Sequence, residues 1–311
     1  MNKKLLTLVM VGLMAMFMAA CGTDESKETS ASSSETISIE HKLDTTDVPK
    51  NPEKVVVFDF GILDSLDKMG IEVAGVPQAT IPSYLSKYES SDYENVGSLK
   101  EPDFEKIAEI DPDLIIISSR QQELYEEFTK ISPTIFLGVD TTRYMESFKE
   151  NMHVLGKIFE QDEFIEEELN SIDKSIESIK DSAENVENSL VVLANEGSLS
   201  AYGPKSRFGL IHDVFGLTPV AKDIEVSTHG QGISFEYLVE KDPEYLYVID
   251  RTAAIGGDVT ADEALKNELV QKTRAYQNDK VIYLNPDYWY LSGGGLISVN
   301  EMISEIENSI K

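Results

Sequence analysis

The chain has 311 residues, and its 56 acidic and 27 basic side chains give a formal net charge of −29. This acidic balance argues against nucleic-acid binding, which needs a basic surface. The length exceeds that of one ordinary core and favours two domains. The single cysteine is Cys21, so the rest of the chain has no disulfide, no cysteine zinc site and no cysteine nucleophile.

The first 21 residues are typical of a targeting segment. Lys3 and Lys4 precede the apolar run 5–20, which ends in small residues directly before Cys21. The run is short for a membrane span, and this order of basic, apolar and small residues predicts a signal peptide. The segment resembles a bacterial lipoprotein signal, which implies that Cys21 is lipidated and becomes the mature N-terminus. The alternative is a plain secretory signal with an incidental cysteine.

Residues 22–40 are polar and rich in Ser, Thr and Glu. Because such a segment cannot bury a core, we expect it to be a flexible tether. Residues 41–161 are then predicted to form a first lobe, in which strand-like runs alternate with amphipathic helices. This alternation predicts a parallel sheet covered by helices. The clearest strand-like runs are 54–60, 73–76 and 133–137.

A long helical region follows. Apolar residues recur at helical spacing from Met145 to Phe159 and again from Phe164 to Ile179. Residues 162–183 contain no Gly or Pro and predict one connecting helix, with a length of roughly 30 Å at about 1.5 Å per residue. A helical connection is stiffer than extended strands, so we expect small lobe movements rather than wide hinge closure.

Residues 184–311 are predicted to form a second lobe. It opens with a strand-like run at 190–194, contains another at 280–284 and closes with a helix at 296–310. Three glycines, 293–295, precede this last helix. They either let helix amides bind an anion or simply permit a tight turn.

An eighteen-residue pattern occurs twice, 131 positions apart, at 103–120 and 234–251. Six positions are identical, and each copy reads as a short helix, an Asp-Pro break, a buried strand and a terminal arginine. In open α/β sheets, ligands bind outside the carboxyl ends of the strands. The repeat therefore predicts two similar lobes that aim Arg120 and Arg251 at a shared cleft. The alternative is a common helix-to-strand joint repeated by chance.

The chain has only five arginines, and a third candidate, Arg207, lies in the turn 203–207. Arginine held in so acidic a chain points to an anionic group that compensates its charge. Arg143 and Arg274 lie outside these motifs.

Two further loops carry candidate ligand contacts. His229 lies in the polar, glycine-containing loop 227–232. It is either an ordinary loop histidine, a metal ligand, or a hydrogen-bond donor to a ligand oxygen. Trp289 and Tyr290 form an aromatic cluster that either plugs a lobe or stacks against a ligand ring. Arginines together with aromatic rings suit a bulky, anionic, aromatic ligand.

Glu105 and Glu236 occupy matching positions in the first turns of the two repeat helices. Such acids either complement the helix dipoles or dock on a dimeric partner with two basic sockets. The chain contains no HExxH, GxSxG or P-loop pattern, and no coupled acid–base pair or nucleophile is visible, which argues against an enzyme.

Five separated motifs resemble the iron-siderophore binding lipoproteins of ABC transporters, specifically the petrobactin and catecholate binders. In chain order they are VVVFDFGILDSLDKMG, VGSLKEPDFEKI, GPKSRFGLIHDVFG, STHGQG and WYLSGGG. The resemblance implies an α/β, class III periplasmic-binding-protein fold. In that fold two lobes, each a mostly parallel sheet flanked by helices, are joined by a single long rigid helix. It also implies capture of a ferric catecholate siderophore between the lobes and delivery to a permease.

The resemblance assigns roles to particular residues. Arg120, Arg207 and Arg251 match the cationic ligand cluster, and Lys87 is a further positive candidate beside them. The other matched residues are His229 and Tyr290, which complete the iron coordination when a siderophore leaves sites open, and Glu105 and Glu236, which dock on the permease. Trp289 is expected to contact the ligand rings.

The resemblance also implies partners and a location. Fe(III) arrives as the siderophore complex, and no cofactor is expected to be permanently bound. The expected partners are the ferric siderophore and an ABC permease dimer with its ATPase, without nucleic acid. We expect a monomer on the outer face of the cell membrane of a Gram-positive bacterium, attached only through its lipid.

Three alternatives stay open at this point. A haem or cobalamin binder of the same fold is the nearest. A zinc- or manganese-binding lipoprotein needs three or four converging His and carboxylate ligands, whereas the expected cleft offers one histidine. A cell-surface enzyme or adhesin is the third class, and an adhesin has no need of paired cleft arginines.

Overall fold

The computed structural model describes residues 35–227 and 229–311. The predicted signal peptide, the predicted lipidation site Cys21 and residues 22–34 of the predicted tether lie outside the described residues. The described chain begins with a two-stranded antiparallel hairpin, β1 (Thr36–Glu40) and β2 (Thr45–Pro49). The predicted tether boundary at residue 40 is therefore wrong by one strand. Ile39 and Val48 explain the difference, because both are buried against the first lobe.

The first lobe is built on a five-stranded parallel sheet in the order β5-β4-β3-β6-β7. Its strands are β3 (Val55–Val57), β4 (Gly75–Val76), β5 (Glu94–Asn95), β6 (Leu114–Ile117) and β7 (Thr134–Phe136). Its helical segments are α2 (Phe60–Lys68), η1 (Ser83–Glu89), α3 (Phe104–Ile110), η2 (Ser119–Leu124), α4 (Tyr125–Thr129) and η3 (Thr141–Arg143).

The second lobe is built on a mixed sheet in the order β10-β9-β8-β11-β12. Strands β8, β11 and β12 are parallel, as predicted, and β9 and β10 add an antiparallel edge. The strands are β8 (Ser189–Asn195), β9 (Ser198–Tyr202), β10 (Gln231–Ile233), β11 (Tyr245–Asp250) and β12 (Val281–Leu284). The helical segments are α7 (Leu210–Asp213), α8 (Phe235–Lys241), α9 (Arg251–Ile255), α10 (Ala261–Leu265), η4 (Val270–Lys272), α11 (Arg274–Gln277) and η5 (Asp287–Ser292).

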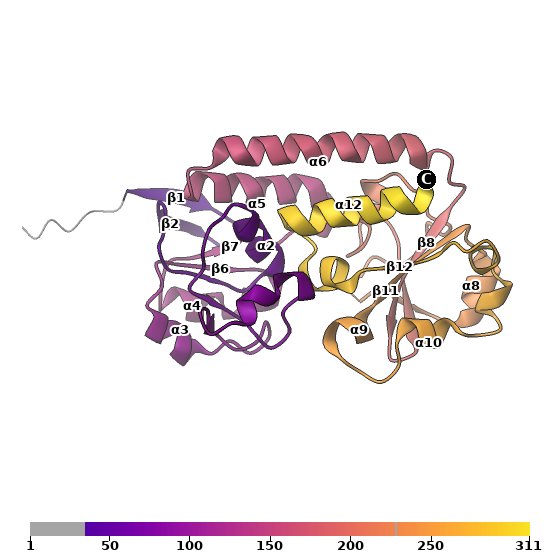
Figure 1. Ribbon diagram of the computed structural model, residues 1–311, viewed down its shortest axis with the longest axis horizontal. Helices are drawn as coiled ribbons and strands as arrows, with labels where there is room; N and C mark the ends of the chain where they lie inside the picture. Colours follow the sequence, from indigo (N-terminus) through magenta and orange to yellow (C-terminus); the bar gives the residue numbers. More distant parts are fainter. Residues whose placement is uncertain (1–34, 228) are drawn as a thin grey trace, which may run out of the picture. The chain divides into compact units, whose positions relative to one another are not determined.

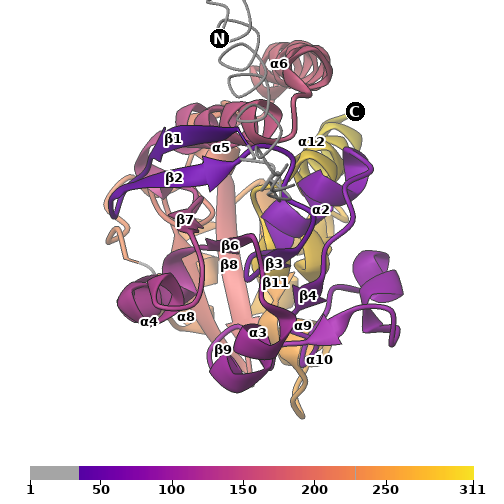
Figure 2. The same cartoon turned by 90° about the vertical axis from the view of Figure 1, so that its left-hand side faces the viewer.

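Three longer helices pack together as one layer: α5 (Tyr144–Ile158), α6 (Asp162–Ala183) and α12 (Leu296–Ile310). Helix α6 has the predicted bounds and packs on α5 and α12, along one side of the molecule in Figures 1 and 2. Helix α12 also packs against α2 of the first lobe. The C-terminal helix, which the sequence assigns to the second lobe, therefore belongs equally to both.

The sequence repeat is also a structural repeat. In the unit α3–β6, strand β6 lies directly beside β3, and in the unit α8–β11, strand β11 lies directly beside β8. Asp111 and Asp242, the aspartates of the two Asp-Pro breaks, end their helices in the left-handed conformation, with φ of 52° and 43°. The same backbone turn thus redirects the chain from helix to strand in both lobes.

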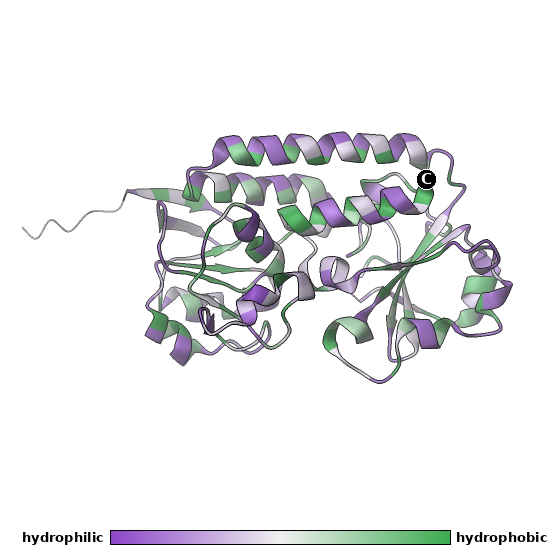
Figure 3. Cartoon of the chain, viewed as in Figure 1, coloured by the Kyte–Doolittle hydropathy of each residue, from purple (hydrophilic) through white to green (hydrophobic). Residues whose placement is uncertain are grey.

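One apolar core is continuous between the lobes. It includes residues of both sheets, such as Val57 and Tyr247, together with Phe148 of α5 and Ile172 of α6. Two smaller cores cover the other faces of the sheets. Figure 3 shows much of the central strands as hydrophobic and α6 as a helix with alternating hydrophobic and hydrophilic patches. The sheets are thereby fixed to a shared helical layer.

Candidate functional site

A cavity of about 590 Å³ is lined by both lobes. The first lobe contributes residues that follow β3, β6 and β7, at the carboxyl ends of its strands. The second lobe contributes the turn 205–208, residues 226–227, and the segment formed by η5 and the glycines after it. This volume lies in the usual range for a small-molecule site. The cavity is therefore where the sequence places the shared cleft.

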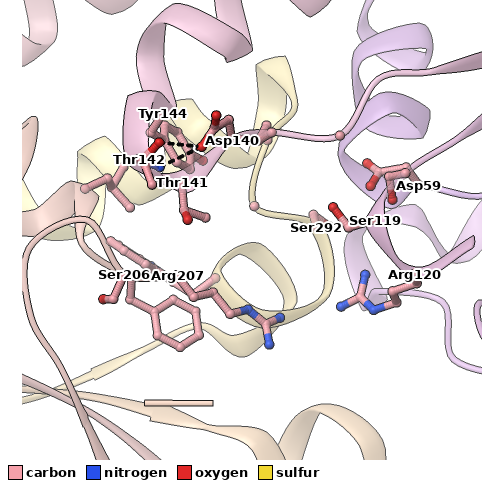
Figure 4. A pocket seen from close by; sticks show the side chains of 18 of the residues that line it. Asp59, Ser119, Arg120, Asp140, Thr141, Thr142, Tyr144, Ser206, Arg207 and Ser292 are labelled. Carbon is pink, nitrogen blue, oxygen red and sulfur yellow. Dashed lines mark hydrogen bonds between the residues drawn. The ribbon is translucent and has the colours of Figure 1, made fainter. Parts of the chain in front are cut away.

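Arg120 and Arg207 face each other from opposite lobes. Figure 4 shows their guanidinium groups pointing toward one another across the cavity. Both donate to the same acceptor, the carbonyl oxygen of Tyr290, at 3.5 Å from Arg120 Nη2 and 2.7 Å from Arg207 Nη2. Burial, with the nearby charge of Arg120, lowers the pKa of the Arg207 guanidinium. Two like charges are thus held together at one carbonyl group.

Local structure fixes both arginines. Arg120 lies in the first turn of η2, where Ser118 and Gln121 form a capping box and Gln121 also donates to Leu99. Arg207 follows a tight turn in which Lys205 has a φ of 62° and Ser206 Oγ donates to the Gly203 carbonyl. Neither side chain depends on a carboxylate partner for its position.

Arg251 contacts the same tyrosine but does not itself line the cavity. It begins α9 directly after β11, and its Nε donates to the Tyr290 hydroxyl at 2.8 Å. The guanidinium of Arg207 lies 4.3 Å from the centre of the Tyr290 ring. Burial alone would raise the pKa of Tyr290, but the Arg251 hydrogen bond and the charges of Arg207 and Arg251 outweigh it and lower the pKa. The two arginines therefore make the phenolate form of Tyr290 easier to reach than in a free tyrosine.

Two lysines that the sequence reasoning missed, Lys42 and Lys205, also line the cavity. Lys42 Nζ donates to Gln122 Oε1 and lies 5.3 Å from the centre of the Phe136 ring. Within residues 35–227 and 229–311, no salt bridge involves Lys42, Lys205, Arg120 or Arg207. Lys205 lies two positions before Arg207 in the turn 203–207, whereas nothing in the local sequence distinguishes Lys42 from the other lysines of the chain.

The remaining two arginines behave differently. Arg143 pairs with Glu146 at 2.9 Å and also with Glu150, while Arg274 pairs with Glu187 at 2.8 Å and with Asp242. The arginines inside the sequence motifs are thus the ones without carboxylate partners in the described part of the chain. Unpaired cations in so acidic a protein mark a site for an anion.

Carboxylates also line the first-lobe wall, but they serve as helix caps. Asp59 caps α2 by accepting from the amides of Gly61 and Ile62. Asp140 caps η3 by accepting from the amide and hydroxyl of Thr142, and these hydrogen bonds lower its pKa. Figure 4 shows Asp140 with Thr142. The first-lobe wall thus presents hydroxyl groups and two helix-capping carboxylates near Arg120 and Arg207.

Four predicted ligand residues lie elsewhere or lie deeper than expected. Lys87 pairs with Asp67 of α2 and does not line the cavity. Arg251 reaches the cavity only through Tyr290, as described above. His229 is exposed beside the lining residue Ser227, whose hydroxyl accepts from the His229 amide. Trp289 lines the cavity but is only 2% exposed, and its indole donates to Glu305 at 2.6 Å, so it packs inside the lobe.

The two predicted docking acids are exposed on matching helices. Glu105 lies in the first turn of α3 and Glu236 in the first turn of α8, in different lobes. Neither lines the cavity. Hydrogen bonds from its own amide and from Ser234 lower the pKa of Glu236. Both carboxylates are therefore free of the ligand site.

The described residues contain no group of three or more His, Cys, Asp or Glu side chains that could hold a metal ion. Over those residues, no helix is both long enough and apolar enough to cross a membrane.

The protein family and the curated proteins that this chain resembles are binding proteins. A family model described as periplasmic binding protein matches residues 55–288. Petrobactin-binding protein YclQ of Bacillus subtilis is 51% identical over 99% of both chains. Ferric-anguibactin-binding protein FatB of Vibrio anguillarum is 34% identical over 87% of this chain and 86% of its own.

Solved structures agree. The crystal structure of YclQ from Bacillus subtilis matches with a TM-score of 0.87 at 54% identity, covering 89% of this chain and 99% of that one. The catecholate-siderophore binding protein VctP from Vibrio cholerae matches with a TM-score of 0.83 at 34% identity. That match covers 88% of this chain and all of VctP.

Proposed function

The chain belongs to the periplasmic binding protein family, and we propose that it is the solute-binding component of an ABC importer for ferric catecholate siderophores. It captures the complex in the cavity between its lobes and delivers it to a permease for iron uptake. The names of its relatives, which bind petrobactin, anguibactin and a catecholate siderophore, support this ligand class.

The observation that carries the proposal is the charge of the cavity. Arg120 and Arg207 converge on one carbonyl group, Lys42 and Lys205 line the same cavity from opposite lobes, and all four lack a carboxylate partner in the described chain. A ferric catecholate carries several negative charges on a rigid aromatic frame. Arginine suits this ligand because it combines charge, paired hydrogen bonds and stacking on rings.

Iron coordination by the protein is a further part of the proposal. A siderophore with only two catechols leaves two iron sites open. The lowered pKa of Tyr290 favours the phenolate form that an iron ligand needs. His229 lies beside Ser227 of the cavity wall and is proposed as the second ligand. Fe(III) enters as part of the ligand rather than as a resident cofactor.

The location and partners follow the same reasoning. A lipid on Cys21 anchors the protein to the outer face of the cell membrane, and residues 22–34 link that anchor to the folded part. The exposed acids Glu105 and Glu236 dock on the two halves of the permease dimer. The protein acts as a monomer in this scheme and has no catalytic role.

Fluorescence titration tests the ligand class. Trp289 is the only tryptophan and lines the cavity, so a bound ferric catecholate is expected to quench its emission at nanomolar to micromolar concentration. Ferric petrobactin is the first probe, and a neutral ferric hydroxamate is the control. Far weaker quenching by the hydroxamate supports the charge argument. Comparable affinity for both complexes contradicts the proposal.

A further inference from the structure

A buried carboxylate links the two lobes directly behind the cavity. Asp64 of α2, in the first lobe, is fully buried. Its Oδ1 accepts from the Ile297 amide at 3.1 Å, and its Oδ2 accepts from the Ser298 amide at 3.0 Å. These amides belong to the first turn of α12, where the helix has no internal acceptors for them. Asp64 therefore caps a helix that begins more than 200 residues later in the chain.

Two glycines make this contact possible. A Cβ atom on Gly61 would lie 2.9 Å from the Gly294 carbonyl carbon. A Cβ atom on Gly295 would lie 1.9 Å from Asp64 Oδ1 and 2.0 Å from the Gly61 carbonyl oxygen. The backbones of α2 and the start of α12 thus touch at positions where only glycine fits. The sequence signal at 293–295 is accounted for by this crossing, and the acceptor at the helix N-terminus is the carboxyl group of Asp64.

The same carboxylate is connected to the cavity wall. The Tyr84 hydroxyl lies 2.9 Å from Asp64 Oδ2 and 2.7 Å from Ser292 Oγ. Ser292 is the last residue of η5 and lines the cavity, where Figure 4 shows it. Because a phenol has one proton, Tyr84 donates to only one of these two oxygens at a time. Asp64, Tyr84 and Ser292 thus form a chain of two hydrogen bonds. Its direction depends on whether Ser292 or a protonated Asp64 donates to the Tyr84 oxygen.

The surroundings of Asp64 contain no compensating cation among residues 35–227 and 229–311. Its titratable neighbours on the packed elements are the phenols of Tyr84, Tyr144 and Tyr288. Among the described residues, no salt bridge involves Asp64. Burial raises the pKa of its carboxyl to about 7, against the lowering effect of the hydrogen bonds from Ser298, Ile297 and Tyr84. Both protonation states are therefore accessible near neutral pH.

We propose that Asp64 is a positioning residue for the ligand cavity. From the first lobe it fixes the start of α12 and, through Tyr84, sets the orientation of the Ser292 hydroxyl in the cavity wall. When Asp64 is ionised, Tyr84 donates to it and Ser292 donates to Tyr84, so Ser292 presents only acceptor lone pairs to the cavity. When Asp64 is protonated, the chain reverses and the Ser292 proton is free to bond an anionic ligand.

This arrangement couples ligand binding to a proton. An anionic ligand that accepts from Ser292 favours the protonated form of Asp64, so binding takes up a proton near neutral pH. The coupling rests on the proposed function only for the identity of the ligand. The linkage of Asp64 to η5 is a property of the empty protein and is measured without any ligand.

The ligand-free test uses the emission of Trp289, which lies in η5 three residues before Ser292. We expect the Trp289 emission of the full-length protein to change with a midpoint at about pH 7. Asp64→Asn and Tyr84→Phe should abolish most of this change. Tyr88→Phe is the matched control, because Tyr88 is a buried neighbour on η1 whose hydroxyl bonds Asp67 instead. An unchanged transition in both Asp64→Asn and Tyr84→Phe overturns the proposal.

Glu305 requires a separate variant, because it bonds the Trp289 indole and burial raises its pKa. A transition lost in Glu305→Gln and kept in Tyr84→Phe assigns the titration to Glu305 and also overturns the proposal. Tyr84→Phe keeps every Asp64 contact with α12, so it remains informative if Asp64→Asn does not fold.

The second arm measures affinity for ferric petrobactin from pH 6 to 8. Tyr84→Phe should weaken binding about tenfold at pH 6, the scale of one charge-assisted hydrogen bond, and by less at pH 8. Equal weakening at both pH values reveals a purely structural role and contradicts the coupling. If no variant and no wild-type protein binds ferric petrobactin, the proposed ligand is wrong while the ligand-free result stands.

Discussion

At the scale of single residues, position and partners separate the arginines into two kinds. Arg120 and Arg207 face the cavity without carboxylate partners in the described chain, whereas Arg143 is paired with Glu146 and Glu150. Arg207→Ala or Arg120→Ala should weaken binding of a ferric catecholate by about 1.5–3 kcal/mol, the scale of a hydrogen bond to a charged group. Fluorescence titration measures the change.

Arg143→Ala is the matched control, because it removes the same charge from the protein outside the cavity. A loss of affinity in this variant comparable to that of Arg207→Ala would attribute the effect to net charge rather than to contact.

Tyr290 gives a second residue-scale prediction. Its pKa is lowered by the hydrogen bond from Arg251 and by the charges of Arg207 and Arg251, so the phenolate is available at lower pH than in a free tyrosine. With a siderophore that has two catechols, Tyr290→Phe and His229→Ala should each weaken binding and shift the iron charge-transfer band. With a hexadentate siderophore the same variants should change little. Equal losses for both ligands would show that neither residue coordinates iron.

The sequence indicates the arginines because they are rare, and because two of them end a repeated motif. It does not indicate Lys42, since lysines are common on any surface and only the fold brings this one to the cavity, and it places Lys205 only as a neighbour of Arg207. It also overestimates Trp289, whose indole is turned inward by Glu305 of α12. Composition singles out a rare residue type, whereas its exposure depends on neighbours distant in sequence.

At the scale of elements, helices with strong apolar periodicity are predicted best. The bounds of α6 and α12 agree with those expected from the sequence. The hairpin β1–β2 and the edge strand β10 are missed, because most of their side chains stay at least partly exposed and give no clear apolar alternation. Contacts between elements are harder still. Nothing in the local sequence shows that Asp64 caps α12.

The crossing of α2 and α12 gives the element-scale prediction. Gly61→Ala should destabilise the protein by about 1–3 kcal/mol, because the added methyl group overlaps the backbone of Gly294 and Gly295. Urea unfolding measures the change. Gly232→Ala is the control, since its added Cβ has no heavy atom within 4 Å. Equal stability of the two variants would mean that the helices separate without cost and that the crossing does not hold the lobes.

At the scale of the whole molecule, the described chain behaves as two sheets fixed to one helical layer. A single apolar core joins both sheets to α5, α6 and α12, and Asp64 adds polar contacts at the same junction. Large hinge motion would break this core. Small lobe movements therefore remain our expectation, and the permease would recognise a nearly constant spacing between Glu105 and Glu236.

Transport gives the prediction that tests this whole-molecule view. Each of the two exposed acids lies in the first turn of its own helix, outside the cavity and in a different lobe. Glu105→Ala and Glu236→Ala should leave siderophore affinity unchanged and reduce iron uptake in cells, because each removes one contact with the permease dimer. The double variant should be more impaired than either single one, since each acid anchors a different lobe.

Helix-dipole stabilisation is the competing explanation for the two glutamates, worth about 0.3–1 kcal/mol each. It predicts a small decrease in melting temperature with normal uptake. Affinity, melting temperature and uptake measured on the same three variants separate the two explanations. Gln replacements remove the negative charge while keeping the side-chain length. They therefore show whether an effect of the Ala variants comes from the lost charge or from the shortened side chain. Normal uptake by a stably folded double variant would rule out docking through these acids.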